Sequence, residues 1–158
     1  MAAFDTTGFT LEWLILYLIH YPRVQEKLYE EVRGALGPNR SPSFADRSKL
    51  PYVNACIEET LRMAPPAPVA LIHRNWGEID IYGYKFPKDC LFVTNVWGIG
   101  NDPDVWGDPE VFRPERHIDE NGAYKKSPIT IPFSIGTFFL DFSFTILYFN
   151  LNLVNHSS

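Results

Sequence analysis

The stretch that most constrains this chain is residues 51–68, PYVNACIEETLRMAPPAP, which we interpret as one short helix between prolines. Pro51 suits the first turn of a helix, where its missing N–H removes no hydrogen bond. Pro65 and Pro66 prevent the helix from continuing. Apolar or small residues between them recur every three or four positions and predict one stripe facing a core: Val53, Cys56, Ile57, Thr60, Leu61 and Ala64.

Three charged residues of this helix, Glu58, Glu59 and Arg62, lie off that stripe. In one interpretation Arg62 forms a solvated pair with Glu58 or Glu59, worth about 0.3–0.5 kcal/mol. In the other, Glu59 and Arg62 form a buried ion pair with a further partner later in the chain. The helix alone favours the solvated pair, and the rest of the chain favours the buried one.

Size and composition indicate one globular domain. The chain has 158 residues, of which 46% are hydrophobic and 21% charged. A net charge of −5 without any basic run argues against nucleic-acid binding. Two cysteines, Cys56 and Cys90, cannot form a disulfide framework, so we expect a reducing compartment. Residues 1–8 lack the features of a signal peptide.

Residues 9–21, FTLEWLILYLIHY, are apolar almost all round, which predicts a buried helix. The uninterrupted apolar run at positions 13–19 is shorter than the roughly 20 residues that span a bilayer. Such a helix needs walls on every side, and we therefore expect the chain to be part of a larger domain.

Asp5 and Thr6 precede this helix and allow two interpretations. Either residue can be its N-cap, which is the more common role of these types. Alternatively, an acid beside an alcohol on a helix can relay protons to a bound group. The small residues Ala2, Ala3 and Gly8 would let a flat ligand approach the backbone.

The next segments carry clear boundary signals. Pro22 begins and Gly37 ends a predicted helix over residues 22–36, whose charged residues at positions 26, 27, 30, 31 and 33 we expect to be solvated. Ser43 and Asp46 have the spacing of a capping box and predict one short helical turn.

After Pro68 the pattern changes to short strands, and residues 70–95 predict a small sheet with His73 and Arg74 in its first strand. Residues 100–128 are predicted to be an irregular but ordered loop, because they contain Trp106 and Phe112. This loop places Arg116 where it could reach Glu59.

Three motifs, in this order, resemble the cytochrome P450 family of haem-thiolate monooxygenases. Residues 2–7, AAFDTT, resemble the family's I-helix motif, with Ala3 in place of a glycine. Residues 59–62, ETLR, match its E-x-x-R motif, and residues 114–117, PERH, match its P-E-R-F motif with His117 in place of the phenylalanine. The connecting sequence is most similar to the animal microsomal branch.

The resemblance implies a mainly α fold with a small β-sheet, as a partial cytochrome P450 fold. It also implies a structural ion triad of Glu59, Arg62 and Arg116, a haem-propionate contact at His73, and a proton-delivering pair at Asp5 and Thr6. The family hydroxylates apolar molecules with O2 and electrons from NADPH-cytochrome P450 reductase, at the endoplasmic reticulum membrane. No anchor segment is visible here, so we expect a cytoplasmic or aggregated chain.

The family's haem-binding loop, F-x-x-G-x-R-x-C-x-G, is only partly present. Phe133 and Gly136 match it, but Phe138 replaces the arginine and Leu140 occupies the position of the axial cysteine. Leucine cannot ligate iron, and that thiolate is the source of the family's oxygen chemistry. Cys56 belongs to the core stripe and Cys90 to a turn, so both are poor substitutes.

We therefore divide the chain into a partial cytochrome P450 domain, residues 1–137, and a Phe-rich tail outside the family pattern, residues 138–158. The tail has five phenylalanines and one charge, Asp141, which is typical of translated non-coding sequence. Three hypotheses follow: a haem-thiolate monooxygenase, a catalytically inactive fragment that acts at most as an interaction partner, and a membrane-associated protein. We expect the chain as written to be inactive.

Overall fold

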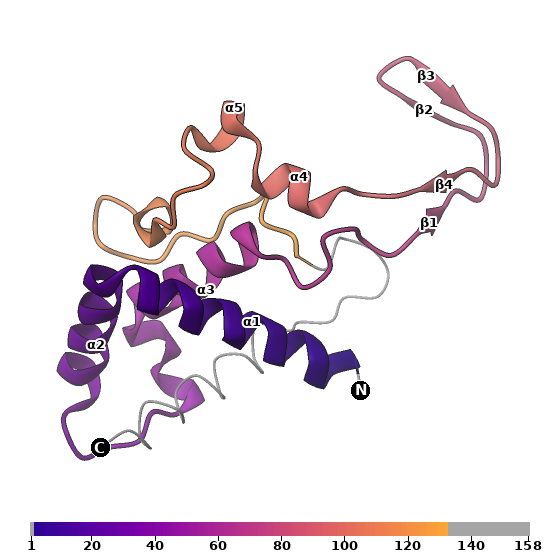
Figure 1. The fold of residues 1–158 in the computed structure, drawn as a ribbon. Helices are drawn as coiled ribbons and strands as arrows, with labels where there is room; N and C mark the ends of the chain where they lie inside the picture. The colour runs from indigo at the N-terminus through magenta and orange to yellow at the C-terminus, as the bar shows by residue number, and fades with distance from the viewer. Residues whose placement is uncertain (1, 133–158) are drawn as a thin grey trace.

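The computed structural model describes residues 2–132, and the predictions made for Phe133, Gly136, Leu140 and the tail lie outside them. The longer helices are α1 (Ala2–His20), α2 (Pro22–Leu36) and α3 (Pro51–Met63), and α4 (Val96–Gly100) and α5 (Pro103–Trp106) are short. Two 3₁₀ segments are η1 (Phe44–Lys49) and η2 (Pro114–His117). The predicted mainly α architecture with a small β part is confirmed (Figure 1).

Helix α3 is the centre of the fold. It contacts α1, α2, α4, η1 and η2, and every residue from Tyr52 to Arg62 is buried. The apolar stripe predicted from its spacing packs into the core, but the opposite side of the helix is buried as well. The core cluster consists of Leu14, Val32, Leu50, Tyr52, Val53, Cys56, Ile57, Leu61 and Phe112.

Helix α1 differs from the sequence prediction in two ways. It already begins at Ala2, so Asp5 and Thr6 lie inside the helix and the N-cap interpretation is wrong. Its buried face consists of Thr7, Thr10 and Leu14.

Leu14, Tyr17 and Leu18 pack in or against the core, but several other large apolar residues of α1 are exposed. Among them are Ile15, Leu16 and Ile19, and Ile19 is 68% exposed. The prediction of a buried helix therefore fails among the described residues, because α2 and α3 cover α1 on one side only (Figure 1).

Helix α2 has the predicted bounds, with Pro22 in its first turn and Gly37 after its end. Gly37 has a φ of 76°, a left-handed conformation that glycine adopts without steric cost. The solvated role predicted for Glu31 is wrong. Its carboxylate accepts hydrogen bonds from Tyr52 N at 2.8 Å and Val53 N at 2.9 Å, and so caps the N-terminus of α3 from a neighbouring helix.

The capping box before η1 is confirmed. The Asp46 carboxylate accepts hydrogen bonds from Ser43 N at 3.0 Å and Ser43 Oγ at 2.9 Å. Arg40 also donates to Asp46 at 2.6 Å, and this bond holds the pKa of the carboxyl well below its usual range.

Within residues 2–132, the β part consists of two separate antiparallel sheets instead of one. Strand β1 (His73–Arg74) pairs with β4 (Leu91–Phe92), and β2 (Ile79–Ile81) pairs with β3 (Tyr84–Phe86). They form an arm that extends away from the helices (Figure 1). The following loop is less irregular than predicted, because α5 and η2 interrupt it.

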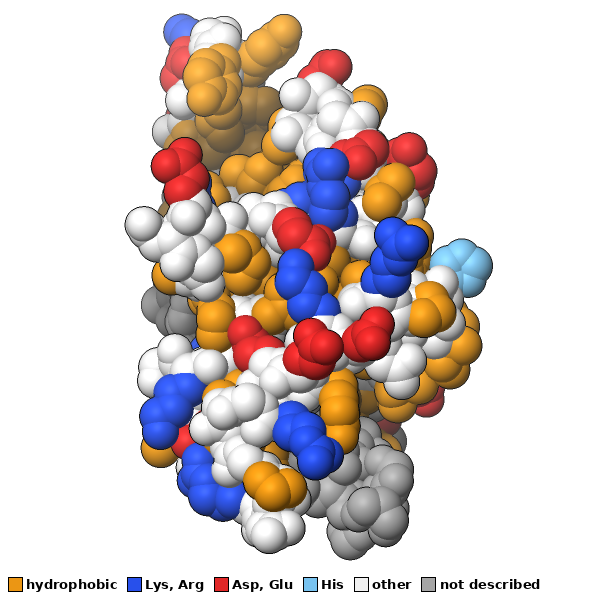
Figure 2. All heavy atoms as spheres, turned by 90° about the vertical axis from the view of Figure 1, so that its left-hand side faces the viewer, with side chains coloured by type: hydrophobic (Ala, Val, Ile, Leu, Met, Phe, Trp, Pro, Cys, Tyr) orange, Lys and Arg blue, Asp and Glu red, His pale blue; other side chains and the backbone are white. Residues whose placement is uncertain are grey.

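Acidic and basic side chains are interspersed on the face that carries α2 (Figure 2). A mixed surface of this kind is typical of a solvated face. Among residues 2–132, no helix combines the length and hydropathy that a membrane crossing requires.

We predict that Glu31→Ala lowers the free energy of unfolding by about 0.5–2 kcal/mol, the range for loss of a helix cap, because two N–H groups of α3 lose their acceptor. Urea unfolding followed by circular dichroism measures the change. Glu30→Ala, on the exposed side of α2, is the matched control and should shift stability by less than about 0.5 kcal/mol. Equal effects of the two variants would contradict the capping role.

Candidate functional site

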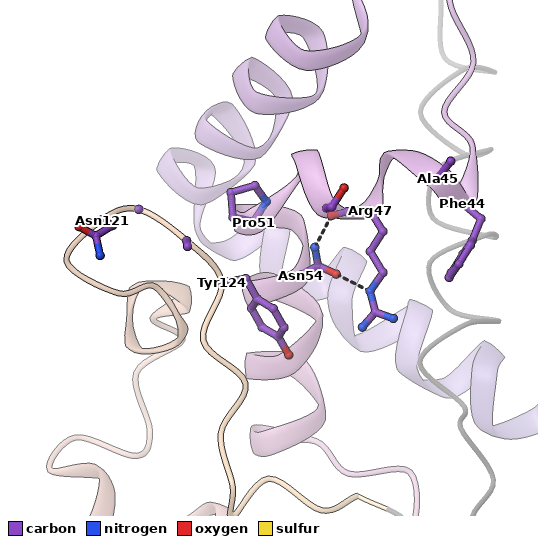
Figure 3. A pocket seen from close by; sticks show the side chains of 10 residues that line it. Phe44, Ala45, Arg47, Pro51, Asn54, Asn121 and Tyr124 are labelled. Carbon is purple, nitrogen blue, oxygen red and sulfur yellow. Dashed lines mark hydrogen bonds between the residues drawn. The ribbon is translucent and has the colours of Figure 1, made fainter.

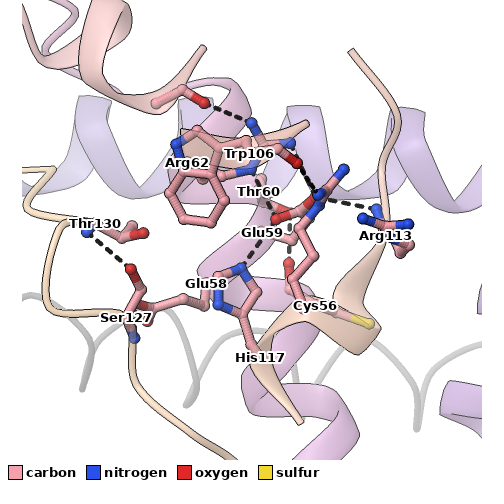
Figure 4. A network of polar contacts seen from close by, with 12 residues as sticks. Cys56, Glu58, Glu59, Thr60, Arg62, Trp106, Arg113, His117, Ser127 and Thr130 are labelled. Carbon is pink, nitrogen blue, oxygen red and sulfur yellow. Dashed lines mark hydrogen bonds and ion pairs between the residues drawn. The ribbon is translucent and has the colours of Figure 1, made fainter. Parts of the chain in front are cut away.

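The polar centre of the molecule is the carboxylate of Glu59, which is 0% exposed (Figure 4). Arg62, one turn further along α3, donates from Nε to Oε2 at 2.8 Å and from Nη2 to Oε1 at 2.9 Å. Arg116 donates from Nε to Oε1 at 3.3 Å, and Arg113 donates from its backbone N at 3.0 Å. The structure thus brings together the three residues of the predicted triad, which lie up to 57 positions apart.

Both guanidinium groups also bind backbone carbonyl groups at the end of α4 and in the segment that follows it. Arg62 donates to the carbonyl oxygens of Gly100 at 2.5 Å and Pro109 at 2.9 Å. Arg116 donates to the carbonyl of Trp106 at 2.6 Å and to that of Asp108 at 2.6 Å. Arg62 and Arg116 therefore connect α3 to residues 100–109, a segment that contains no long helix.

Gly100 is required where this loop meets α3. A Cβ at that position would overlap the backbone carbonyl of Arg62. The close approach lets the Gly100 carbonyl accept from the Arg62 guanidinium, and the Trp106 ring covers the same guanidinium with its centroid 5.0 Å away.

His117 is a further partner of Glu59 that the sequence did not predict. Its side chain is 1% exposed, and Nε2 lies 2.9 Å from Glu59 Oε2. The only signal in the sequence is that His117 replaces the phenylalanine of the P-E-R-F motif, which puts a polar ring where the pattern has an apolar one. The Glu59 carboxylate is thereby surrounded by five nitrogen contacts.

Electrostatics explain why this buried acid is ionised. Burial alone would raise the pKa of Glu59, but hydrogen bonds from His117 and Arg62 outweigh it and lower the pKa to about 2. The Asp108 carboxylate accepts from Arg116 at 2.6 Å, which lowers its pKa as well. The second guanidinium of the triad therefore has its own counter-ion at the surface.

The other predicted site residues lie elsewhere. Asp5 and Thr6 are neighbours near the start of α1, with Asp5 exposed, and His73 is an exposed residue of β1. Among residues 2–132, none of these three belongs to the set that contacts the Glu59 carboxylate. Phe133, Gly136 and Leu140 fall outside the described residues.

The described residues do not fit an axial thiolate for haem. Cys56 is fully buried in the core, and burial raises the pKa of its thiol well above the usual value. Cys90 is half-buried at the turn before β4. No group of three or more His, Cys, Asp or Glu side chains within residues 2–132 is arranged to hold a metal ion.

A cavity of about 790 Å³ opens between η1, the start of α3 and the turn at residues 121–124 (Figure 3). Arg47 and Asn54 form its polar wall, with Arg47 Nε donating to Asn54 Oδ1 at 3.0 Å. Of the predicted site residues within residues 2–132, none lines this cavity.

Residues 1–137 match the family model for cytochrome P450. The chain belongs to the cytochrome P450 family. Similar proteins include human cytochrome P450 2U1, 39% identical over 136 residues, and guinea pig (Cavia porcellus) cytochrome P450 1A1, 40% identical over 126 residues. A steroid 17-alpha-hydroxylase/17,20 lyase of Gallus gallus is 39% identical over 137 residues.

These matches cover 86%, 80% and 85% of this chain but only 25%, 24% and 27% of the respective relatives. The chain thus spans about a quarter of the length of the curated relatives it matches. The family resemblance and the partial cytochrome P450 fold inferred from the three motifs are confirmed.

We predict that Glu59→Ala and Arg116→Ala each lower the free energy of unfolding by about 3–5 kcal/mol, because each strands a buried charge. The double variant should be far from additive, since the second substitution removes the charge that the first left unpaired. Chemical denaturation of the four proteins gives the coupling energy. Arg40→Ala, which pairs with Asp46, is the control and should add independently to Glu59→Ala. Full additivity for the Glu59 and Arg116 pair would disprove their contact in solution.

A second prediction concerns the loss of stability at acidic pH. The folded pKa of Glu59 is about 2, against an ordinary value of 4.5, so its stabilising effect is fully present above pH 4.5. That effect is lost as the pH falls from 4.5 through 2. Urea unfolding at a series of pH values should show a steeper acid loss for the native chain than for Glu59→Gln. Parallel curves would mean that Glu59 is not held ionised by its neighbours.

Proposed function

We propose that this fold serves the family reaction, hydroxylation of an apolar organic substrate with O2, and that the chain as written is catalytically inactive. The proposed inactivity rests on Leu140, which stands at the position of the axial cysteine, and on the burial of Cys56. Haem bound through a thiolate supplies the oxygen chemistry of this family. Neither leucine nor a thiol enclosed in the core can supply that thiolate.

The remaining residues have proposed roles that follow the family pattern. Glu59, Arg62 and Arg116 stabilise the fold and take no part in chemistry, which agrees with their complete set of internal partners. Asp5 and Thr6 are the proposed proton-delivering pair, supported by their adjacent places in one helix. His73, Phe133 and Gly136 are proposed to contact haem, and NADPH-cytochrome P450 reductase at the endoplasmic reticulum membrane is the proposed electron donor.

A second candidate is an interaction or membrane-associated protein without catalysis. The exposed apolar face of α1, with Ile15, Leu16 and Ile19, favours it, because exposed apolar patches promote association. The charge of Asp141 argues against insertion of the tail into a bilayer, since a carboxylate costs about 2.5–3.5 kcal/mol at the centre of a spanning helix. Pelleting with carbonate-washed membranes would support this second candidate.

Haem binding tests the first proposal. We expect the purified chain, titrated with haem and then reduced under carbon monoxide, to show no thiolate-type Soret band. The double variant Phe138→Arg with Leu140→Cys should retain more haem, because it restores the family's loop pattern. Phe142→Cys is the matched control, since it adds a thiol two positions away and should have no effect.

Two outcomes of these experiments would contradict the proposal. A thiolate carbonyl band from the unmodified chain would overturn the proposal, and Cys56→Ser and Cys90→Ser would then identify the ligand. Identical spectra for the double variant and for Phe142→Cys would show that position 140 is not the ligand position.

A further inference from the structure

Glu58, the neighbour of Glu59, is also a buried carboxylate with specific partners. Its side chain is 7% exposed, and Oε2 accepts a hydrogen bond from the Tyr124 hydroxyl at 2.6 Å. Its other oxygen, Oε1, accepts from the backbone N of Ser127 at 3.3 Å. Burial and the bond to Glu58 raise the pKa of Tyr124, so the hydroxyl remains protonated and donates throughout the physiological range.

The two side chains that reach Glu58 and Glu59 come from opposite ends of one turn. His117 lies before the turn and Tyr124 after it, and Ile118 and Tyr124 face each other in an antiparallel bridge. Lys125 N donates to the His117 carbonyl at 2.8 Å and closes the base of the turn.

The tip of this turn is organised by its own contacts. The Asp119 carboxylate accepts from Asn121 N at 2.9 Å and from Ala123 N at 2.8 Å. Gly122 has a φ of 78°, which a residue with a side chain rarely adopts. The segment from residue 117 to 125 is therefore a preformed unit that α3 holds from outside.

We propose that His117 and Tyr124 are positioning residues that clamp this turn to α3 at two points, and thereby fix the path of residues 125–132. Consecutive residues on a helix project roughly 100° apart, so Glu58 and Glu59 hold the two ends of the turn in different directions. One attachment would let the turn rotate about the contact, whereas two exclude that rotation.

Residues 125–132, which follow the clamp, are also held by hydrogen bonds. Ser127 N is bound by Glu58, and the Ser127 hydroxyl accepts from Ile129 N and Thr130 N, both at 3.3 Å (Figure 4). Residues 125–132 lead directly to Phe133. The identity of the following loop as the haem loop rests on the proposed function, but the clamp itself does not.

The charged and titratable groups around the two contacts differ. Glu59 and His117 face Arg62 on α3, the Arg116 side chain of η2 and the backbone N of Arg113. Lys125 and Lys126 line the small cavity beside His117. At the second contact, Tyr124 lies near Arg47 of η1 in addition to Glu58. The clamp thus consists of one imidazole contact and one hydroxyl contact, which can be removed separately.

Hydrogen exchange on the full chain, read by mass spectrometry, tests the clamp without haem. His117→Phe keeps an aromatic ring but removes the donor, and Tyr124→Phe removes only the hydroxyl. Each should accelerate exchange in residues 118–130 by roughly tenfold, the effect of losing one buried hydrogen bond, with little change in α2. His117→Gln, which restores an N–H donor, should recover much of the protection.

Tyr29→Phe on α2 is the matched control, because the Tyr29 hydroxyl accepts from exposed Arg33 and its loss should leave residues 118–130 unchanged. The proposal is overturned if exchange rises equally along the whole chain, if Tyr124→Phe leaves the segment protected, or if His117→Gln behaves like His117→Phe. Because no haem is added, a failed haem titration and a failed clamp are independent outcomes.

Discussion

The fold depends on the ionised carboxylate of Glu59. An isolated buried charge is costly, and this one is stable because two guanidinium groups, one imidazole and one backbone N–H converge on it. The dependence is mutual. Without Glu59, the guanidinium of Arg62 would remain in a site that is 1% exposed. Helix α3 and the loop from residue 100 to 117 therefore cannot separate without exposing unpaired charge to the core.

Local signals explain which helices could be predicted from the sequence. The prolines at the start of α2 and α3, Gly37 after α2, and the Ser43–Asp46 capping box act on their own or adjacent turns, and each has the predicted effect. The predictions that failed concern residues whose environment is set by neighbouring helices. The polar buried face of α1 and the capping of α3 by Glu31 follow from how the helices pack, which the spacing within one helix does not contain.

The site was predictable only through the family pattern. The spacing of Glu59 and Arg62 fits a solvated pair as well as a buried one, and Arg116 is decisive because it reaches Glu59 from 57 positions away. His117 shows the limit of such a pattern. A departure from a motif marks a position as unusual, but it does not say that the new side chain will join the carboxylate which the motif already serves.

Stability and chemistry are separable in this chain. Among residues 2–132, the partners of the Glu59 carboxylate lie between residues 62 and 117, and those of the Glu58 carboxylate are Tyr124 and Ser127. All of these bonds are made between protein atoms, so none of them depends on what stands at position 140. The proposed replacement of the axial cysteine by Leu140 would therefore leave these buried pairs intact. The architecture that residues 58–127 share through these bonds is therefore maintained by the protein's own side chains and backbone.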